Sequence, residues 1–247
     1  MLRLITIPIS HYCEKARWAL DRARLPYTEQ KLLPGVHALY TWGAARHRLV
    51  PVLVHDAGAL GESSAILRWI DQRVEPSARL FPDGDAAVEG WVERFDKELG
   101  RGSRLWAYSV LLKDTKTVKA QFQSVYSGLA RAAMPVMLPL GIAAIRKRYG
   151  VTQPRAEAAL ERCEAVFNDV ADALAENGSG FLVGERFTAA DLTFASLAAP
   201  MLLPIEYGGG LLPLGQMPQA FQGVVNRFRD HAAGKYAMRL YAQQRYG

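Results

Sequence analysis

The sequence predicts an α/β N-terminal domain followed by an all-α C-terminal domain. Over about the first eighty residues, short apolar, β-branched segments alternate with helical patterns. Residues 80–84 (Leu-Phe-Pro-Asp-Gly) break this alternation and are typical of a linker. Only helical periodicity follows them. We therefore expect domains at residues 1–79 and 85–247, joined by a linker at residues 80–84.

Each element of the N-terminal part is indicated by its own local pattern. The strands are expected where apolar and β-branched residues gather, at residues 2–7, 27–33, 52–55 and 59–60. The helices are expected at residues 13–24 and 63–74, with a helical turn near residues 36–44. Asp56-Ala57-Gly58 joins the last two strands as a turn.

The C-terminal part contains a series of helical patterns. They cover residues 85–112, 118–149 (with proline interruptions), 154–176, 189–203, 218–231 and 236–245. Thr188 and Asp191 form an acidic variant of the capping box before residues 189–203, with Phe187 and Leu192 at the staple positions. We expect this motif to be structural and to start a core helix.

Composition places the protein among ordinary globular proteins. It has 247 residues, of which 50% are hydrophobic and 22% are charged. Its two cysteines, Cys13 and Cys163, are too few for a disulfide framework, which favours a reducing compartment. The N-terminus carries no secretory signal pattern, so we expect a cytoplasmic protein.

The formal net charge of +6 suits an anionic partner. However, the Lys and Arg residues are spread along the chain. The densest cluster, Arg146-Lys147-Arg148, stands where cations complement the end of a helix. Since no nucleic-acid motif accompanies it, we expect no nucleic-acid partner. The longest apolar stretch, residues 132–145, is shorter than the about 20 residues needed to span a bilayer. It is expected to be a buried or kinked helix, with membrane-surface contact as the less favoured alternative.

A hydroxyl and a thiol stand at the start of the first expected helix, in the run Ser10-His11-Tyr12-Cys13. Free backbone N–H groups and the helix dipole at such a position favour an anion, including a thiolate. That thiolate can belong to Cys13 or to a bound substrate, and the spacing alone leaves both interpretations open.

Two further sites stand at the ends of expected elements. Pro51 opens a strand, since proline does not occupy central strand positions. A cis bond before it would turn the Val50 backbone toward an extended peptide, whereas a trans bond would simply start the strand. Glu62 and Ser63 stand at a helix start, where they can cap the helix or bind an amino-acid head group.

In order and spacing, these sites resemble the motifs of the cytosolic glutathione transferase family. Ser10-His11-Tyr12-Cys13 is similar to the Ser-x-x-Cys start of the first helix in theta- and delta-like members. Val50-Pro51-Val52-Leu53 resembles the cis-proline signature, Glu62-Ser63 the γ-glutamyl site, and residues 188–191 the capping box of the helical domain. The resemblance covers nearly the whole chain.

The resemblance implies a thioredoxin-like domain and a helical domain, a homodimer, glutathione as co-substrate and no metal. It implies that Ser10 is catalytic and donates a hydrogen bond to the glutathione sulfur, and that Tyr12 is one of the residues that bind glutathione. Val50 and Pro51 would hold the cysteinyl backbone of glutathione. Glu62 and Ser63 would hold its γ-glutamyl end.

The resemblance is less specific about the remaining contacts. His37, His47 or Arg48 would bind the glycyl carboxylate. A hydrophobic electrophile would bind between the domains, among Leu105, Trp106 and Tyr108. The five histidines show no metal-ligand spacing.

Two alternatives to a glutathione transferase remain. Cys13 could act in a glutathione-dependent thiol/disulfide reductase, although the exposed nucleophile position of such enzymes holds Ser10 here. The chain could also be a glutathione-binding or membrane-associated module that performs no catalysis.

Overall fold

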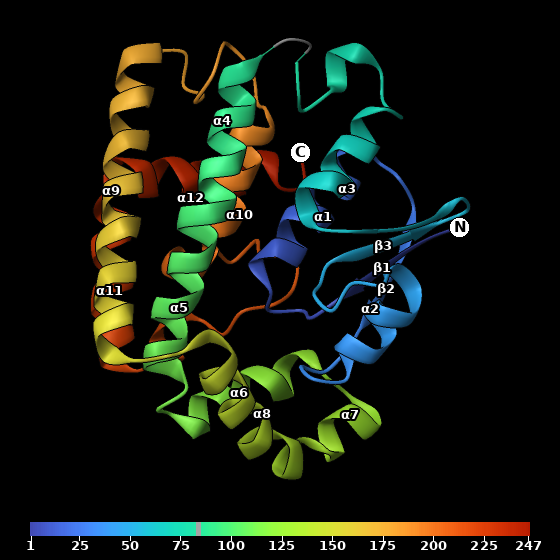
Figure 1. Ribbon diagram of the computed structural model, residues 1–247. Coiled ribbons are helices and arrows are strands. Elements are labelled where there is room, and N and C mark those ends of the chain that lie inside the picture. The colour runs from blue at the N-terminus through green and yellow to red at the C-terminus, as the bar shows by residue number, and fades with distance from the viewer. Residues whose placement is uncertain (83–84) are drawn as a thin grey trace.

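The computed structural model describes residues 1–82 and 85–247, and Figure 1 shows the arrangement of its elements. Four strands form one mixed sheet in the order β2-β1-β3-β4. They are β1 (Leu2–Thr6), β2 (Tyr27–Lys31), β3 (Val52–His55) and β4 (Gly58–Gly61). Strand β1 runs parallel to β2 and antiparallel to β3, and β3 runs antiparallel to β4.

Three helices accompany this sheet. The parallel pair β1–β2 needs a crossover, which α1 (His11–Arg22) supplies. Helix α3 (Ser63–Asp71) packs against α1, and α2 (His37–Ala45) contacts β3 and β4 from the other side of the sheet (Figure 1). This arrangement confirms the thioredoxin-like domain.

In the part of the chain that the structure describes, the C-terminal domain contains helices and loops but no strand. A short 3₁₀ turn (Pro76–Ala78) precedes it, and another (Leu214–Gln216) interrupts it. Its helices are α4 (Ala86–Arg94), α5 (Gly100–Leu111), α6 (Thr115–Val125), α7 (Gly128–Ala132), α8 (Met134–Tyr149), α9 (Gln153–Asn177), α10 (Ala189–Leu202), α11 (Gln219–Asp230) and α12 (Ala232–Gln244).

Two predicted helices differ from the observed ones. Residues 85–112 are nearly continuous, but Phe95–Leu99 are π-helical and join α4 to α5. Residues 118–149 fall in three helices. Extended backbone at Tyr126 and Ser127 separates α6 from α7, and a turn at Ala133 separates α7 from α8. The predicted domain limits stay predictions, and Asp83 and Gly84 of the predicted linker lie outside the described residues.

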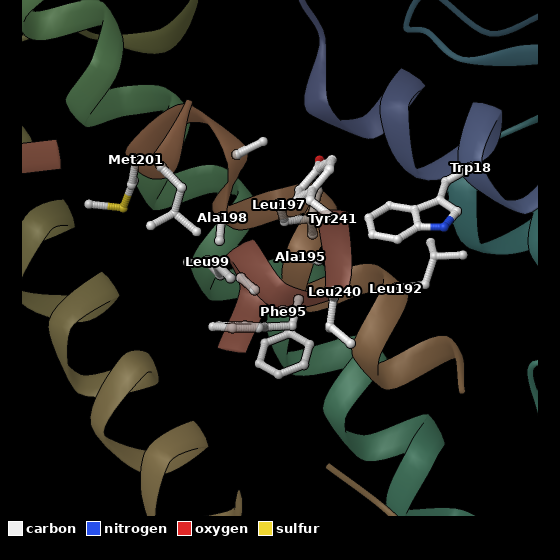
Figure 2. Packing of buried hydrophobic residues seen from close by; sticks show 14 of the residues in the cluster. Trp18, Phe95, Leu99, Leu192, Ala195, Leu197, Ala198, Met201, Leu240 and Tyr241 are labelled. Atoms are coloured by element: carbon white, nitrogen blue, oxygen red, sulfur yellow. The ribbon is translucent and has the colours of Figure 1, made fainter. Parts of the chain in front are cut away.

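Helix α10 forms the centre of the helical core and is buried along almost its whole length. The predicted capping box starts it. Asp191 accepts a hydrogen bond from the Thr188 backbone N–H at 2.6 Å, and the Thr188 hydroxyl accepts one from the Ala190 N–H at 3.3 Å. Figure 2 shows α10 side chains packed among Phe95 and Leu240 from neighbouring segments.

Helix α1 belongs to both domains, since nine of its twelve residues are buried. Trp18 lies 4.8 Å from the Tyr241 ring of α12 (Figure 2), and its indole N–H donates to the Gln244 carbonyl at 3.0 Å. Lys15, also buried, forms an ion pair of 2.9 Å with Asp96 of the π-helical segment. The helix that starts at the candidate site is therefore held by the helical domain.

A buried ionic cluster strengthens this connection. The Glu14 carboxylate, fully buried, accepts hydrogen bonds from Arg17 at 3.0 Å, from Arg245 at 2.7 Å and from the Gly208 N–H at 3.0 Å. Arg17 also bonds Glu29 at 2.7 Å. Arg17 is thus a structural residue of this cluster, and Arg245 brings the end of the chain onto α1.

Candidate functional site

Ser10 is the N-cap residue of α1, at the junction with β1. Its backbone is extended, with φ −78° and ψ 119°, and its N–H donates to the Ile7 carbonyl at 3.0 Å. Its hydroxyl makes none of the usual capping hydrogen bonds to backbone N–H groups, and the side chain is half-buried. The hydroxyl at this helix N-terminus is therefore not used for capping.

Cys13 lies one turn further and faces the interior, with 0% of its surface exposed. Burial raises the pKa of its thiol to about 11, although Arg17 and the Ser10 side chain act in the opposite direction. A thiol with this pKa is protonated at neutral pH, and the attacking species in thiol chemistry is the thiolate. The geometry therefore argues against Cys13 as a nucleophile.

Burial of both cysteines leads to a testable result. Burial raises the pKa of Cys163 to about 12, so at pH 8 both native thiols are almost entirely protonated and shielded. We expect neither to react with 5,5′-dithiobis(2-nitrobenzoate) within minutes at pH 8, and both to react in guanidinium chloride. Fast reaction of one native thiol, lost in Cys13→Ala, would restore Cys13 as a reactive group.

The Val50–Pro51 peptide bond is cis, as the resemblance implied. The ladder pairs of β3 begin at Val52, so Val50 lies outside them and is half-buried. The chain turns here immediately before a central strand. This leaves the Val50 backbone at the edge of the candidate site.

Glu62 joins β4 to α3 in an unusual conformation. Its φ is 68° and its ψ is 130°, a region that residues other than glycine rarely occupy and that is enriched at functional sites. Its exposed carboxylate forms no ion pair with a described residue. Ser63, which follows it, is buried at the first position of α3. The pair presents a free carboxylate beside free helix N–H groups.

The three candidates for binding a carboxylate differ in their surroundings. His37 accepts a hydrogen bond from the Gly35 N–H at 3.1 Å, and burial lowers the pKa of its ring, which also contacts the Leu33 and Arg48 backbones. It therefore shapes the loop. His47 lies against Gly61, where an added Cβ would be 2.8 Å from its Nδ1. Arg48 is exposed, with its guanidinium 5.2 Å from the Trp42 ring centre, and forms no ion pair with a described residue.

The side chains of Tyr12 and Trp106 both contact the helical domain. The Tyr12 hydroxyl donates to the Asp96 carbonyl at 2.8 Å, and the Asp96 carboxylate accepts a hydrogen bond from Ser64, the residue after Ser63. Trp106 is buried, with its ring centre 4.6 Å from that of Phe221. It packs in the hydrophobic core, and its place in an acceptor pocket stays a prediction. Leu105 and Tyr108 are half-buried.

Tyr12 and Tyr108, both predicted site residues, belong to an aromatic cluster with Arg104 and Tyr149, which the sequence did not indicate. The Arg104 guanidinium is 5.6 Å from the Tyr12 ring centre and 4.5 Å from that of Tyr149, and the Tyr108 and Tyr149 rings are 5.5 Å apart. Arg104 forms no ion pair with a described residue. The i, i+4 spacing of Arg104 and Tyr108 indicates a shared helix face, but nothing local points to Tyr149.

The described residues also hold features remote from this site. A cavity of about 420 Å³ opens at the other end of α1, lined by Arg22, Asp71 and Gln244 among others. Between residues 1–82 and 85–247, no three His, Cys, Asp or Glu side chains are grouped as a metal site would require.

Comparison with known proteins identifies the family. Residues 4–78 match the model of the glutathione S-transferase N-terminal domain, and residues 133–210 match that of the glutathione S-transferase C-terminal domain. Together these matches cover more than half of the chain. The chain matches no curated protein.

Solved structures of glutathione S-transferases share the fold. The enzyme CsGST63524 of Ceriporiopsis subvermispora, in complex with glutathione, is 16% identical with a TM-score of 0.68, over 99% of this chain and 97% of that one. Glutathione S-transferase III in its apo form is 18% identical (TM-score 0.64; 99% and 93% covered). An enzyme from Rhodospirillum rubrum is 21% identical (TM-score 0.58; 99% of both chains). The chain therefore belongs to the glutathione S-transferase family.

Proposed function

We propose that this protein is a glutathione transferase in which Ser10 stabilises the glutathione thiolate for attack on a hydrophobic electrophile. The observation that carries the proposal is the Ser10 hydroxyl, which stands at the N-terminus of α1 without capping it. Structures of similar fold were solved with glutathione or glutathione sulfonate bound, which supports glutathione as the ligand.

Glutathione would extend from Ser10 toward the start of α3. The Glu62 carboxylate would pair with the γ-glutamyl ammonium, and Ser63 and the helix N–H groups would bind its carboxylate. The Val50 backbone beside Pro51 would pair with the cysteinyl residue, as in the addition of a strand. Of the candidates for the glycyl carboxylate, Arg48 is favoured because it is a free, exposed cation.

The proposed chemistry needs a modest stabilisation of the thiolate. A free thiol has a pKa of about 8.5, and lowering it by about two units requires about 2.7 kcal/mol. A hydrogen bond to a charged group supplies about 1.5–3 kcal/mol, and a helix N-terminus about 0.3–1 kcal/mol. The thiol proton leaves to solvent. The sulfur then forms a bond to the electrophilic carbon, and the leaving group departs with the electrons of the broken bond.

The electrophile would bind against Tyr12, Tyr108 and Tyr149. Their rings offer apolar faces to a flat aromatic substrate, and Arg104 offers a cation to its electron-withdrawing groups. The cluster replaces Trp106 as the predicted wall of the acceptor site. A homodimer, as the resemblance implied, remains part of the proposal.

Glutathione binding and turnover test this function. We expect calorimetry to detect binding of glutathione and of S-hexylglutathione, and absorbance to detect conjugation of 1-chloro-2,4-dinitrobenzene. Binding without turnover of several electrophiles would favour a non-catalytic module. Disulfide reduction that is lost in Cys13→Ala would favour the reductase. Absence of any glutathione binding would contradict all three functions.

A further inference from the structure

Although Lys and Arg are spread along the chain, the net positive charge is carried by one segment. Residues 113–149 contain seven Lys or Arg side chains and a single acidic residue, Asp114. Their excess of six positive charges equals the formal net charge of the whole chain, so the rest of the sequence is formally neutral. All seven cations are exposed: Lys113, Lys116, Lys119, Arg131, Arg146, Lys147 and Arg148.

The same segment exposes large apolar side chains. Leu129 of α7 is 90% exposed, and Val136 and Leu140 of α8 are 72% and 66% exposed. Val136, Leu140 and Ala144 follow each other at helical spacing on α8 and are all exposed, so they form one stripe along it. We name Leu129, this stripe and the seven cations the α7–α8 patch. It lies at one end of the molecule in Figure 1, where α6, α7 and α8 gather.

Helix α8 is apolar on both of its faces. Met134 and Ile142 point inward, and Met134 packs with Phe122 and Tyr126 of the α6 region in a small separate core. The outer stripe has no partner among the described residues. A helix that is apolar on all sides is normally buried, so this exposed face indicates a surface that binds a partner. The prediction that residues 132–145 are buried is thus only half correct.

The positive charge of the α7–α8 patch, together with its apolar side chains, distinguishes between three possible partners. A second copy of the chain would bring two surfaces of six positive charges together, which is unfavourable. A nucleic acid would satisfy the cations but would leave Leu129, Val136 and Leu140 against phosphates and water. An anionic lipid surface attracts the cations and accepts the apolar side chains below its headgroups.

We propose that the α7–α8 patch docks this protein on anionic membrane surfaces, with α8 lying in the interface. None of the helices in the described parts of the chain is long and apolar enough to cross a membrane. A surface position is therefore the geometry that fits α8. Tyr149, at the end of α8, would bring the acceptor cluster close to the lipid in which hydrophobic electrophiles dissolve.

Co-sedimentation with vesicles tests the docking. We expect the full chain to bind vesicles of phosphatidylcholine and phosphatidylglycerol at least tenfold more tightly than vesicles of phosphatidylcholine alone, in 50 mM salt. Because exposed charges are screened, 500 mM salt should abolish most of the difference. Equal binding to both vesicles, or none to either, would overturn the proposal.

Two variants separate the contributions of charge and apolar surface. The triple change Lys116→Gln, Lys119→Gln and Lys147→Gln should weaken binding to anionic vesicles at least tenfold. The triple change Leu129→Ser, Val136→Ser and Leu140→Ser should do the same without altering the charge. If the apolar variant binds as wild type does, the side chains do not enter the lipid and the proposal fails.

A matched control removes the same number of charges elsewhere. Arg3, Arg101 and Lys235 are exposed and lie outside the patch, and their change to Gln should leave vesicle binding unchanged. Circular dichroism and glutathione calorimetry check that each variant is folded, so loss of docking is distinguishable from loss of the proposed function. A wild-type dimer that the apolar variant dissociates would show that a second copy covers the patch. Tighter, vesicle-competing binding to an oligonucleotide would likewise overturn docking.

Discussion

Replacing Ser10 with alanine is expected to lower kcat/KM for glutathione conjugation by about 10- to 150-fold, the range of one hydrogen bond to a charged group. The Ser10 hydroxyl makes no capping bond to α1, so its removal should leave the fold and the thermal midpoint nearly unchanged. Initial-rate assays with 1-chloro-2,4-dinitrobenzene measure kcat/KM. Calorimetry measures the affinity for glutathione separately.

The activity loss in Ser10→Ala should depend on pH in a direction that follows from the role of the hydroxyl. The hydroxyl donates to the charged sulfur and therefore lowers the pKa of the bound thiol. Without it the pKa rises, so the loss in Ser10→Ala should be largest near pH 6.5 and should shrink toward pH 9. Ser10→Thr keeps a hydroxyl and should retain more activity than alanine does. Cys13→Ala should retain the wild-type profile, and an unchanged profile in Ser10→Ala would exclude the proposed role.

Replacing Glu14 with glutamine is expected to cost about 3–5 kcal/mol of unfolding free energy, as when one partner of a buried ion pair is removed. The side chain keeps its shape, but Arg17 and Arg245 lose the buried charge that they share. Urea unfolding followed by fluorescence and circular dichroism measures the change in midpoint and slope.

An exposed ion pair provides the control for Glu14. Glu93 pairs with Lys97 four residues further along one helical surface, and both side chains are largely exposed. Glu93→Gln should leave the urea midpoint unchanged, because surface pairs are screened by solvent. Equal effects of the two variants would show that the Glu14 cluster is not a stabilising feature.

The features predicted correctly from the sequence depend on neighbours in the chain. The Thr188–Asp191 capping box needs only four consecutive residues, and its hydrogen bonds form as expected. The same holds for the strand that follows Pro51 and for α1, which the sequence predicts from residue 13 and which begins two residues earlier, at His11. Such local motifs can be recognised in the sequence because they do not depend on tertiary packing.

The features that the sequence left undecided depend mostly on partners from distant parts of the chain. From the sequence alone, the apolar side chain of Trp106 fits a substrate pocket or the core equally well. Its packing in the core follows from its contact with Phe221, which is far away in the chain. Arg104 is an ordinary surface cation until α8 brings Tyr149 to it. The conformation of Glu62, with its positive φ, has no signal in the sequence, because glutamate is not a residue that favours it.

The contacts of helix α1 also limit which domains could be exchanged between related proteins during evolution. Its Trp18, Lys15 and Glu14 have partners in the helical domain, so a free N-terminal fragment would expose the indole and would lose the Asp96 partner of Lys15 and the Arg245 partner of Glu14. Another helical domain could replace the present one only if it supplied matching partners at Gln244, Asp96 and Arg245. Recombination between relatives would therefore exchange this chain as a whole more readily than it would exchange either half.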